Sequence, residues 1–172
     1  MSASGLLSRS VGGPSVYPPQ PKSVVQMAYG NTAWPTSEGA NRYRRSLYTY
    51  SKRTAPFAAF STFDAPSGEV CIARRDRSTT PLQALTLLND EMYLEIAEGL
   101  ARQSIRDVGE VAGPARDREI ASRMFRRLLV RDPSSAELDA IVKFYQSQSG
   151  DKASWMLVAR ALMNTDEAIT TP

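Results

Sequence analysis

Apolar positions recur at three- and four-residue spacing over the second half of the chain, which is typical of helices with one buried face. From about residue 91 to 106, Ile96 and Leu100 belong to such a stripe, with glutamates and arginines opposite. The same spacing continues from Pro114 to just before Asp132, from Ser134 to Gly150, and from about Ala153 to Met163. Because short connections make neighbouring helices antiparallel, the pattern predicts a compact helical bundle.

The most clearly marked helix start in the chain precedes these helices. Thr80-Pro81-Leu82-Gln83 has the form of a capping box, with proline at the first helical position. The residues after it are apolar around most of the helix circumference, so we expect this short helix to lie centrally in the core. Asn89 and Asp90 are suited to end it and to cap the next helix.

The first half of the chain lacks this periodicity. Residues 1 to about 42 contain glycines and prolines that discourage both helix and central strand, with Tyr17-Pro18 and Trp34-Pro35 as candidate aromatic anchors. Strand-type residues occur between 43 and 79 only in short runs, so we expect at most one small β-ribbon. The sequence therefore predicts a mainly α protein in which an irregular Gly/Pro-rich arm (1–42) and an Arg/aromatic-rich segment (43–79) precede a helical bundle (80–170). The last two parts would form one domain.

Composition removes most familiar site chemistry. The chain has no histidine and one cysteine, which excludes a catalytic triad with histidine, a Cys/His zinc site, a haem-attachment CxxCH and an intrachain disulfide. No metal-ligand spacing and no glycine-rich phosphate loop is present. Cys71 could pair outside the chain, bind a ligand or pack in the core, and packing is favoured because free cysteine is among the most buried residue types.

Basic residues are concentrated in one region. The segment from Arg42 to Arg77 carries a charge of +5, whereas the whole chain carries +3. Its arginines, interleaved with aromatic residues, could bind carboxylate, sulfate or phosphate groups. Alternatively, they pair internally and cap carbonyls, tying the irregular segment to the bundle. The candidate cluster comprises Arg44, Arg45, Lys52, Arg53, Arg74, Arg75 and Arg77, with Asp64, Cys71, Gln83, Asn89 and Asp90 as possible partners.

Two aspartates raise the question of catalysis. If folding brought Asp64 and Asp90 together, the pair could share general acid and base work. Their spacing gives no support for such a meeting, and a cap plus a salt bridge is the favoured interpretation. The sequence thus holds no complete catalytic constellation.

Several motifs nevertheless occur in a specific order. They are Gly12-Gly13-Pro14-Ser15-Val16, Tyr43-Arg44-Arg45-Ser46-Leu47-Tyr48, Lys52-Arg53, Phe63-Asp64-Ala65-Pro66, Cys71 with Arg74-Arg75-Asp76-Arg77, and Thr80 to Leu85 with Leu88-Asn89-Asp90. Together they resemble the C-terminal part of a large bacterial domain of unknown function, the planctomycete-type domain that accompanies cytochrome-c-like modules. The end, Asn164-Thr165-Asp166-Glu167, is similar too, although Ala168 stands where the family often has phenylalanine.

The resemblance carries further expectations. Family members are much longer, so it implies a fragment of an exported parent protein, periplasmic or at the cell surface, whose signal peptide lies upstream. It also implies that haem is possible in the parent, while this chain itself holds no cofactor. The resemblance assigns no catalytic residue.

Three functions follow from these observations. The favoured one is a structural or interaction segment whose partner is the upstream portion of its own parent. The second is binding of anionic, sulfated polysaccharide through the arginine and aromatic patch, and the third is part of a hydrolytic or redox enzyme whose other groups lie upstream. Nucleic acid is an unlikely partner because the later helices are not basic on one face, and no apolar run is long enough for a membrane span.

Overall fold

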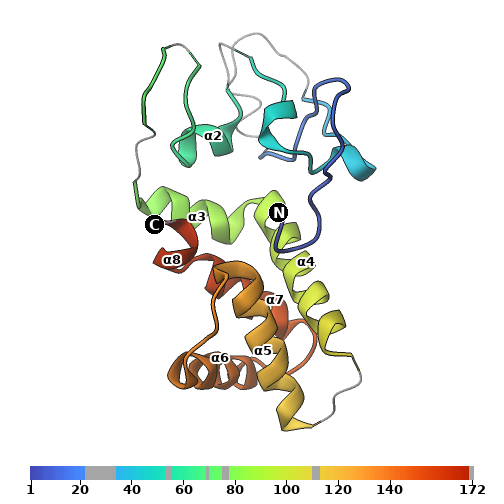
Figure 1. Cartoon of the computed structure of the whole chain (residues 1–172), viewed down its shortest axis with the longest axis vertical. Helices are drawn as coiled ribbons and strands as arrows, with labels where there is room; N and C mark the ends of the chain where they lie inside the picture. Colours follow the sequence, from blue (N-terminus) through green and yellow to red (C-terminus); the bar gives the residue numbers. More distant parts are fainter. Residues whose placement is uncertain (22–33, 53–55, 69, 75–77, 110–112, 171–172) are drawn as a thin grey trace. The chain divides into compact units, whose positions relative to one another are not determined.

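Helices dominate the computed structural model, which describes residues 1–21, 34–52, 56–68, 70–74, 78–109 and 113–170 (Figure 1). Within these ranges, β pairing consists of two isolated parallel bridges, Ser8 with Arg44 and Val16 with Thr49. The prediction of a mainly α chain with at most one small ribbon is confirmed. The chain divides into two compact units, one formed by Leu7–Met92 and the other by Met1–Leu6 together with Tyr93–Pro172. The boundaries predicted at residues 42 and 79 stay a prediction.

The Leu7–Met92 unit is built from short helices and irregular chain. Its elements are the 3-10 helices η1 (Gly39–Asn41) and η2 (Ser46–Tyr48) and the helices α2 (Ala58–Thr62) and α3 (Pro81–Asn89). The aromatic anchors are confirmed: the Trp34 indole donates to the Pro18 carbonyl at 2.8 Å and stacks on Phe57 with ring centroids 5.8 Å apart, and Tyr17 meets Trp34 edge-on. Aromatic packing therefore replaces regular hydrogen-bonded structure as the organising contact here.

Helix α3 begins as predicted but does not lie where it was expected. Both hydrogen bonds of the capping box are present between Thr80 and Gln83. However, α3 exposes Leu82 by 61% and Leu85 by 56%, and its buried residues are Gln83 and Leu87. The expectation of a central, all-round buried helix was wrong, because the helix buries a polar side chain and turns leucines outward. The Asp90 carboxylate accepts from the Met92 amide at 2.9 Å and caps the next helix, as predicted.

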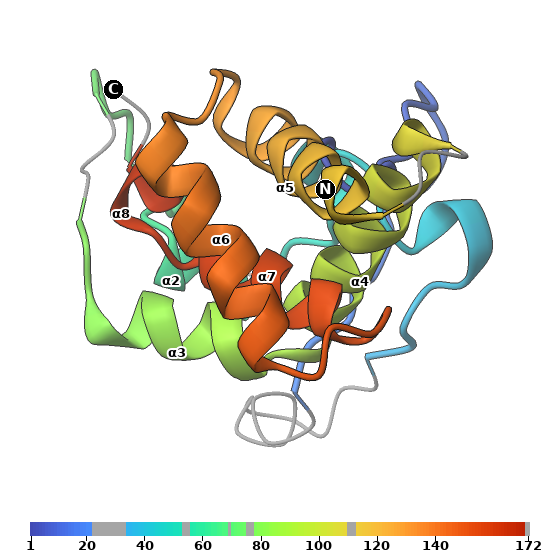
Figure 2. The ribbon, with the colours of Figure 1, turned by 90° about the horizontal axis from the view of Figure 1, so that it is seen from below.

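The second unit contains the predicted bundle. It comprises α4 (Glu91–Val108), whose first two residues belong to the other unit, with α5 (Pro114–Leu129), α6 (Ser135–Ser147), α7 (Ser154–Met163) and the short α8 (Asp166–Ile169). Helix α5 contacts α6, α7 and α8, and α7 contacts α6 and α8 (Figure 2). The capping box at Ser134 and Glu137 is formed. The core gathers apolar residues from each of the long helices, among them Leu100, Ile120, Met124, Ile141, Trp155 and Val158.

The first six residues of the chain pack against α4 and α5. Gly99, in the middle of α4, faces this segment so closely that an added Cβ would lie 3.1 Å from Leu6 Cγ and 3.2 Å from Ser4 Cβ. The Arg127 guanidinium donates to the Ala3 carbonyl at 3.3 Å. The absence of a side chain at Gly99 thus makes room for an irregular strap on the bundle.

Candidate functional site

Arg44 lies at the centre of the arginine-rich segment and is 4% exposed. Its guanidinium donates to three backbone carbonyls of one loop: Ser10 at 3.0 Å, Gly12 at 2.5 Å and Pro14 at 3.3 Å. Its Nε is buried without a hydrogen-bond partner. Five donors in a fixed fork suit a guanidinium to this task, since otherwise the carbonyls of an irregular loop lack partners. Arg44 therefore replaces a strand partner for residues 10–14.

Tyr48 completes this arrangement. The Arg44 guanidinium lies 3.7 Å from the centroid of the Tyr48 ring, and the Gly12 amide donates to the Tyr48 hydroxyl at 3.0 Å. That hydrogen bond, aided by Arg45, lowers the pKa of the Tyr48 phenol below its ordinary value. Gly13 takes a φ of +90°, a region open to glycine, with its Cβ position 3.6 Å from Arg44 Nη1. The loop, the arginine and the ring thus form one rigid cluster.

A second cluster surrounds the start of α3. The Gln83 side chain is 1% exposed; its amide donates to the Thr62 carbonyl at 2.9 Å and to Ser78 Oγ at 3.1 Å, and its oxygen accepts from the Thr80 amide. The Asp64 carboxylate accepts from the Ser78 amide at 2.9 Å and from its hydroxyl at 2.7 Å. Asp64 itself has a φ of +53°. We call Thr62, Asp64, Ser78, Thr80 and Gln83 the α3 hub.

The α3 hub joins both ends of one loop. Asp64 and Ser78 stand fourteen residues apart in the chain and are linked by two hydrogen bonds, so the two ends of this stretch meet beside the helix start. Sequence analysis missed Ser78 and gave Gln83 only a partner role. A buried glutamine at the third position of a capping box was the available signal, because such a side chain has one donor group left over for a second segment.

The structure describes three other residues of the predicted cluster. Arg45 is exposed and lies 5.7 Å from the Tyr48 ring centroid, Arg74 is exposed, and Lys52 is half-buried. Arg53, Arg75 and Arg77 lie outside the described residues. Whether the cluster binds anions or serves only the fold stays a prediction, but Arg44 is already committed to carbonyls.

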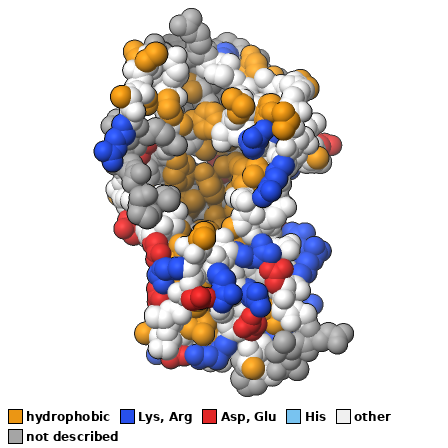
Figure 3. Space-filling view, viewed as in Figure 1, with side chains coloured by type: hydrophobic (Ala, Val, Ile, Leu, Met, Phe, Trp, Pro, Cys, Tyr) orange, Lys and Arg blue, Asp and Glu red, His pale blue; other side chains and the backbone are white. Residues whose placement is uncertain are grey.

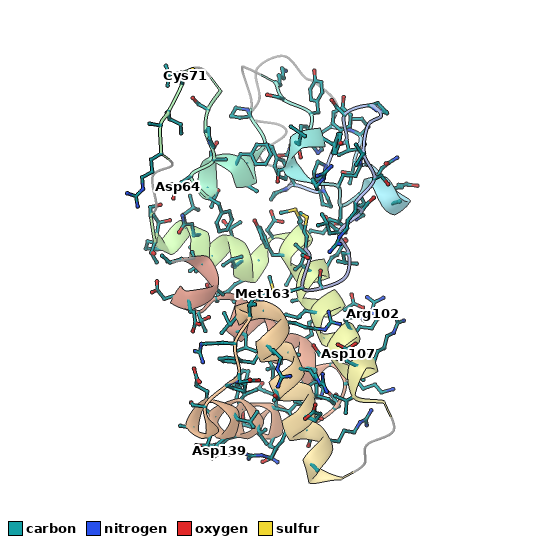
Figure 4. The ribbon with its side chains drawn as sticks, viewed as in Figure 1. Asp64, Cys71, Arg102, Asp107, Asp139 and Met163 are labelled. Atoms are coloured by element: carbon teal, nitrogen blue, oxygen red, sulfur yellow. The ribbon has the colours of Figure 1, made fainter. Side chains whose placement is uncertain are left out.

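The remaining predicted residues fall into separate places. Asp64 belongs to the α3 hub, whereas Asp90 caps α4 at the opposite end of the nine-residue helix α3, about 12 Å along its axis. The two carboxylates therefore do not form the acid–base pair considered above. Asn89 is exposed and donates to the Leu85 carbonyl. The favoured interpretation of Cys71 was wrong: its thiol is free and exposed (Figure 4), and its neighbours Val70 and Ile72 are exposed as well.

Comparison with known sequences identifies the family. A family model described as "PSD1: Protein of unknown function (DUF1553)" matches residues 1–145. The chain belongs to the DUF1553 family. No curated protein and no solved structure matches it. The match covers both the Arg44 cluster and the α3 hub, but a family of unknown function assigns no role to either.

The residues of this DUF1553 chain do not fit covalently attached haem, because the sequence has no histidine and one cysteine. In the described part of the chain, no group of three or more His, Cys, Asp or Glu side chains could hold a metal ion. Among the same residues, no helix is long and apolar enough to cross a bilayer.

Ion pairs cover the surface of the bundle in the DUF1553 chain. Arg131 donates to Glu137 and to Glu167, each at 2.7 Å, and its guanidinium lies over the Phe125 ring. The hydrogen bonds from Arg131, with those from Ser134, lower the pKa of Glu137 from 4.5 to about 2. Basic and acidic side chains alternate over this part of the surface (Figure 3). Such exposed pairs are typical of a solvated face and individually stabilise little.

Proposed function

We propose that this chain is a structural and interaction segment of a larger exported protein, and that its Leu7–Met92 unit binds another part of that protein. One observation carries the proposal. Six of the eight exposed large apolar side chains in the described part of the chain belong to this unit. They are Val11, Leu47, Val70, Ile72, Leu82 and Leu85.

Leu82 and Leu85 are the most informative of the six. Single exposed apolar residues are common on protein surfaces, but these two are three residues apart on α3 and so share one face of the helix. The α3 hub holds that helix through the buried Gln83 side chain in its first turn. A helix fixed in this way with leucines turned outward suits recognition by an apolar groove or by another helix.

The remaining parts of the proposal rest on family membership and on the resemblance. The partner is the upstream portion of the parent, which the resemblance places in an exported protein with cytochrome-c-like modules. Haem, in that arrangement, would be held by those modules. The neighbouring surface also supports an interaction role: hydrophobic side chains gather in a hollow of the surface in the part of Figure 3 that carries α2 and α3.

The proposal is tested by separating the two parts of the parent. The upstream portion and this chain are expressed as separate proteins and run together on size exclusion. We expect co-elution, and we expect Leu82→Glu with Leu85→Glu to abolish it, since both changes keep good helix formers while placing charge on the apolar face. Val130→Asp, at an apolar position of the other unit that is even more exposed than Leu82 and Leu85, is the control. Absence of a complex, or equal loss with the control, contradicts the proposal.

A second function is favoured by a different observation, the exposure of Arg45 and Arg74. Exposed guanidinium groups bind sulfate bidentately, so an anionic polysaccharide is the alternative ligand.

A catalytic role is less well supported. Three donors reach one Asp64 oxygen, including Gln83 at 3.5 Å, and they favour a structural role for that carboxylate over a catalytic one.

A further inference from the structure

Two paired segments of the Leu7–Met92 unit carry nearly the same tripeptide. Arg9-Ser10-Val11 follows Ser8, and Arg45-Ser46-Leu47 follows Arg44. A parallel bridge joins Ser8 to Arg44, and the Ser8 amide donates to the Tyr43 carbonyl at 2.8 Å, so each tripeptide directly follows a bridged residue. The fold therefore places an Arg-Ser-aliphatic sequence twice on one part of the surface.

Every residue of both tripeptides is exposed. Val11 and Leu47 are the extreme cases, since each is 82% exposed. The hydrogen bond from the Gly12 amide to the Tyr48 hydroxyl joins their immediate neighbours in the chain. We call Arg9, Ser10, Val11, Arg45, Ser46 and Leu47 the paired-tripeptide patch.

The backbone beneath this patch is fixed. Buried Arg44 holds the carbonyls of Ser10, Gly12 and Pro14, and a second parallel bridge joins Val16 to Thr49 further along. The exposure of Val11 and Leu47 is thus imposed by an ordered network of contacts. The contacts of buried Arg44 therefore fix the backbone, and with it the positions of the exposed Val11 and Leu47 side chains.

The charge of this region has one sign. Segments 7–16 and 43–50 together contain three arginines and no acidic residue. Neither exposed arginine of the patch therefore has a carboxylate within these two segments. We therefore expect the ligand of the paired-tripeptide patch to carry negative charge and to have an apolar region next to that charge.

We propose that the paired-tripeptide patch docks the chain peripherally on an anionic lipid surface. Guanidinium forks match phosphate groups bidentately, and the neighbouring Val11 and Leu47 enter the boundary between headgroups and acyl chains. A polysaccharide would satisfy the arginines but would leave both aliphatic side chains in water. An anionic membrane satisfies both kinds of group, which is why it is favoured over a purely polar ligand.

The test uses the whole chain and vesicle sedimentation. Vesicles of phosphatidylglycerol with phosphatidylcholine are compared with vesicles of phosphatidylcholine alone, each at low and high salt. We expect binding to the anionic vesicles that weakens with salt. Arg9→Gln with Arg45→Gln should lower the partition constant roughly 25-fold, at about fivefold for each arginine near an anionic surface. Val11→Ser with Leu47→Ser, which leaves the charge unchanged, should lower it by at least as much.

A matched control separates the patch from the rest of the surface. Arg102→Gln with Val130→Ser removes one exposed arginine and one exposed aliphatic side chain from the other unit, and should leave binding unchanged. Unchanged circular dichroism spectra confirm that each variant is folded. No binding to anionic vesicles, an equal loss with the control, or retention on a heparin-like resin without vesicle binding overturns the proposal. The last outcome would assign the arginines to a soluble anionic ligand, and an acidic protein partner would likewise bind without vesicles.

Discussion

Residues 1–6 lie so close to α4 that packing decides whether Gly99→Ala stabilises or destabilises the fold. Gly99→Ala places a methyl group 3.1 Å from Leu6 Cγ and 3.2 Å from Leu6 Cδ1, inside ordinary van der Waals contact. In an exposed helix interior the same change would stabilise by about 1 kcal/mol, because alanine is the better helix former. Overpacking typically costs about 1–3 kcal/mol. We therefore expect the gain to be cancelled or reversed, with a net loss of up to about 2 kcal/mol.

The decisive quantity is the coupling between the two residues. Leu6→Ala removes the atoms nearest to the new methyl group, so Gly99→Ala should be at least about 1 kcal/mol more favourable in that background. Urea unfolding, followed by Trp155 fluorescence, measures the free energy of unfolding of Gly99→Ala with and without Leu6→Ala. Trp34 is replaced by phenylalanine in every variant, so that only the tryptophan of the bundle contributes to the signal. The exposed helical position Ala140→Gly calibrates the intrinsic helix preference. If Gly99→Ala stabilises both backgrounds equally, Gly99 does not serve the strap and the reasoning is refuted.

Two further predictions concern polar groups. Gln83→Ala should destabilise the α3 hub by about 2–4 kcal/mol, because it leaves the Thr62 carbonyl and the Thr80 amide without partners; hydrogen exchange of the α3 amides measures this, and exposed Asn89→Ala should change it little. For the bundle, the depressed pKa of Glu137 means that its ion pair with Arg131 stabilises the fold above about pH 4.5 and that this stabilisation is lost as the pH falls toward 2. Glu137→Gln should therefore weaken the acid dependence of the melting temperature over that range, whereas Glu98→Gln, which breaks a one-turn pair with Arg102, should not. Parallel acid curves for Glu137→Gln and the unaltered chain would contradict this prediction.

Local patterns predicted the helices well, and contacts distant in sequence explain what they did not predict. The capping boxes at Thr80 and Ser134 and the helix start at Pro114 depend on neighbouring residues, so they could be identified from the sequence. The position of α3 could not, because its apolar composition does not reveal that Gln83 is the residue turned inward. Short α2 and α8 were also missed, since four or five residues are too few to show a period.

The candidate site, too, could be predicted from the sequence only in part. The arginine-rich segment was evident from composition, yet the residue that matters most to its structure, Arg44, binds carbonyls thirty or more residues earlier in the chain. Nothing in the local sequence distinguishes it from the exposed Arg45 beside it. The expected burial of Cys71 was wrong because residue type alone predicts only an average, whereas Cys71 itself is exposed.

During synthesis, the strap formed by residues 1–6 cannot pack until the helices that receive it have been made. Met1–Leu6 are synthesised before Leu7–Met92, but the helices that receive them follow only after that whole unit. At 5–20 residues per second, the strap waits roughly 4–17 s for its binding surface even to begin to emerge. Leu7–Met92 can become compact in that interval, while the bundle binds a segment made before that whole unit was synthesised.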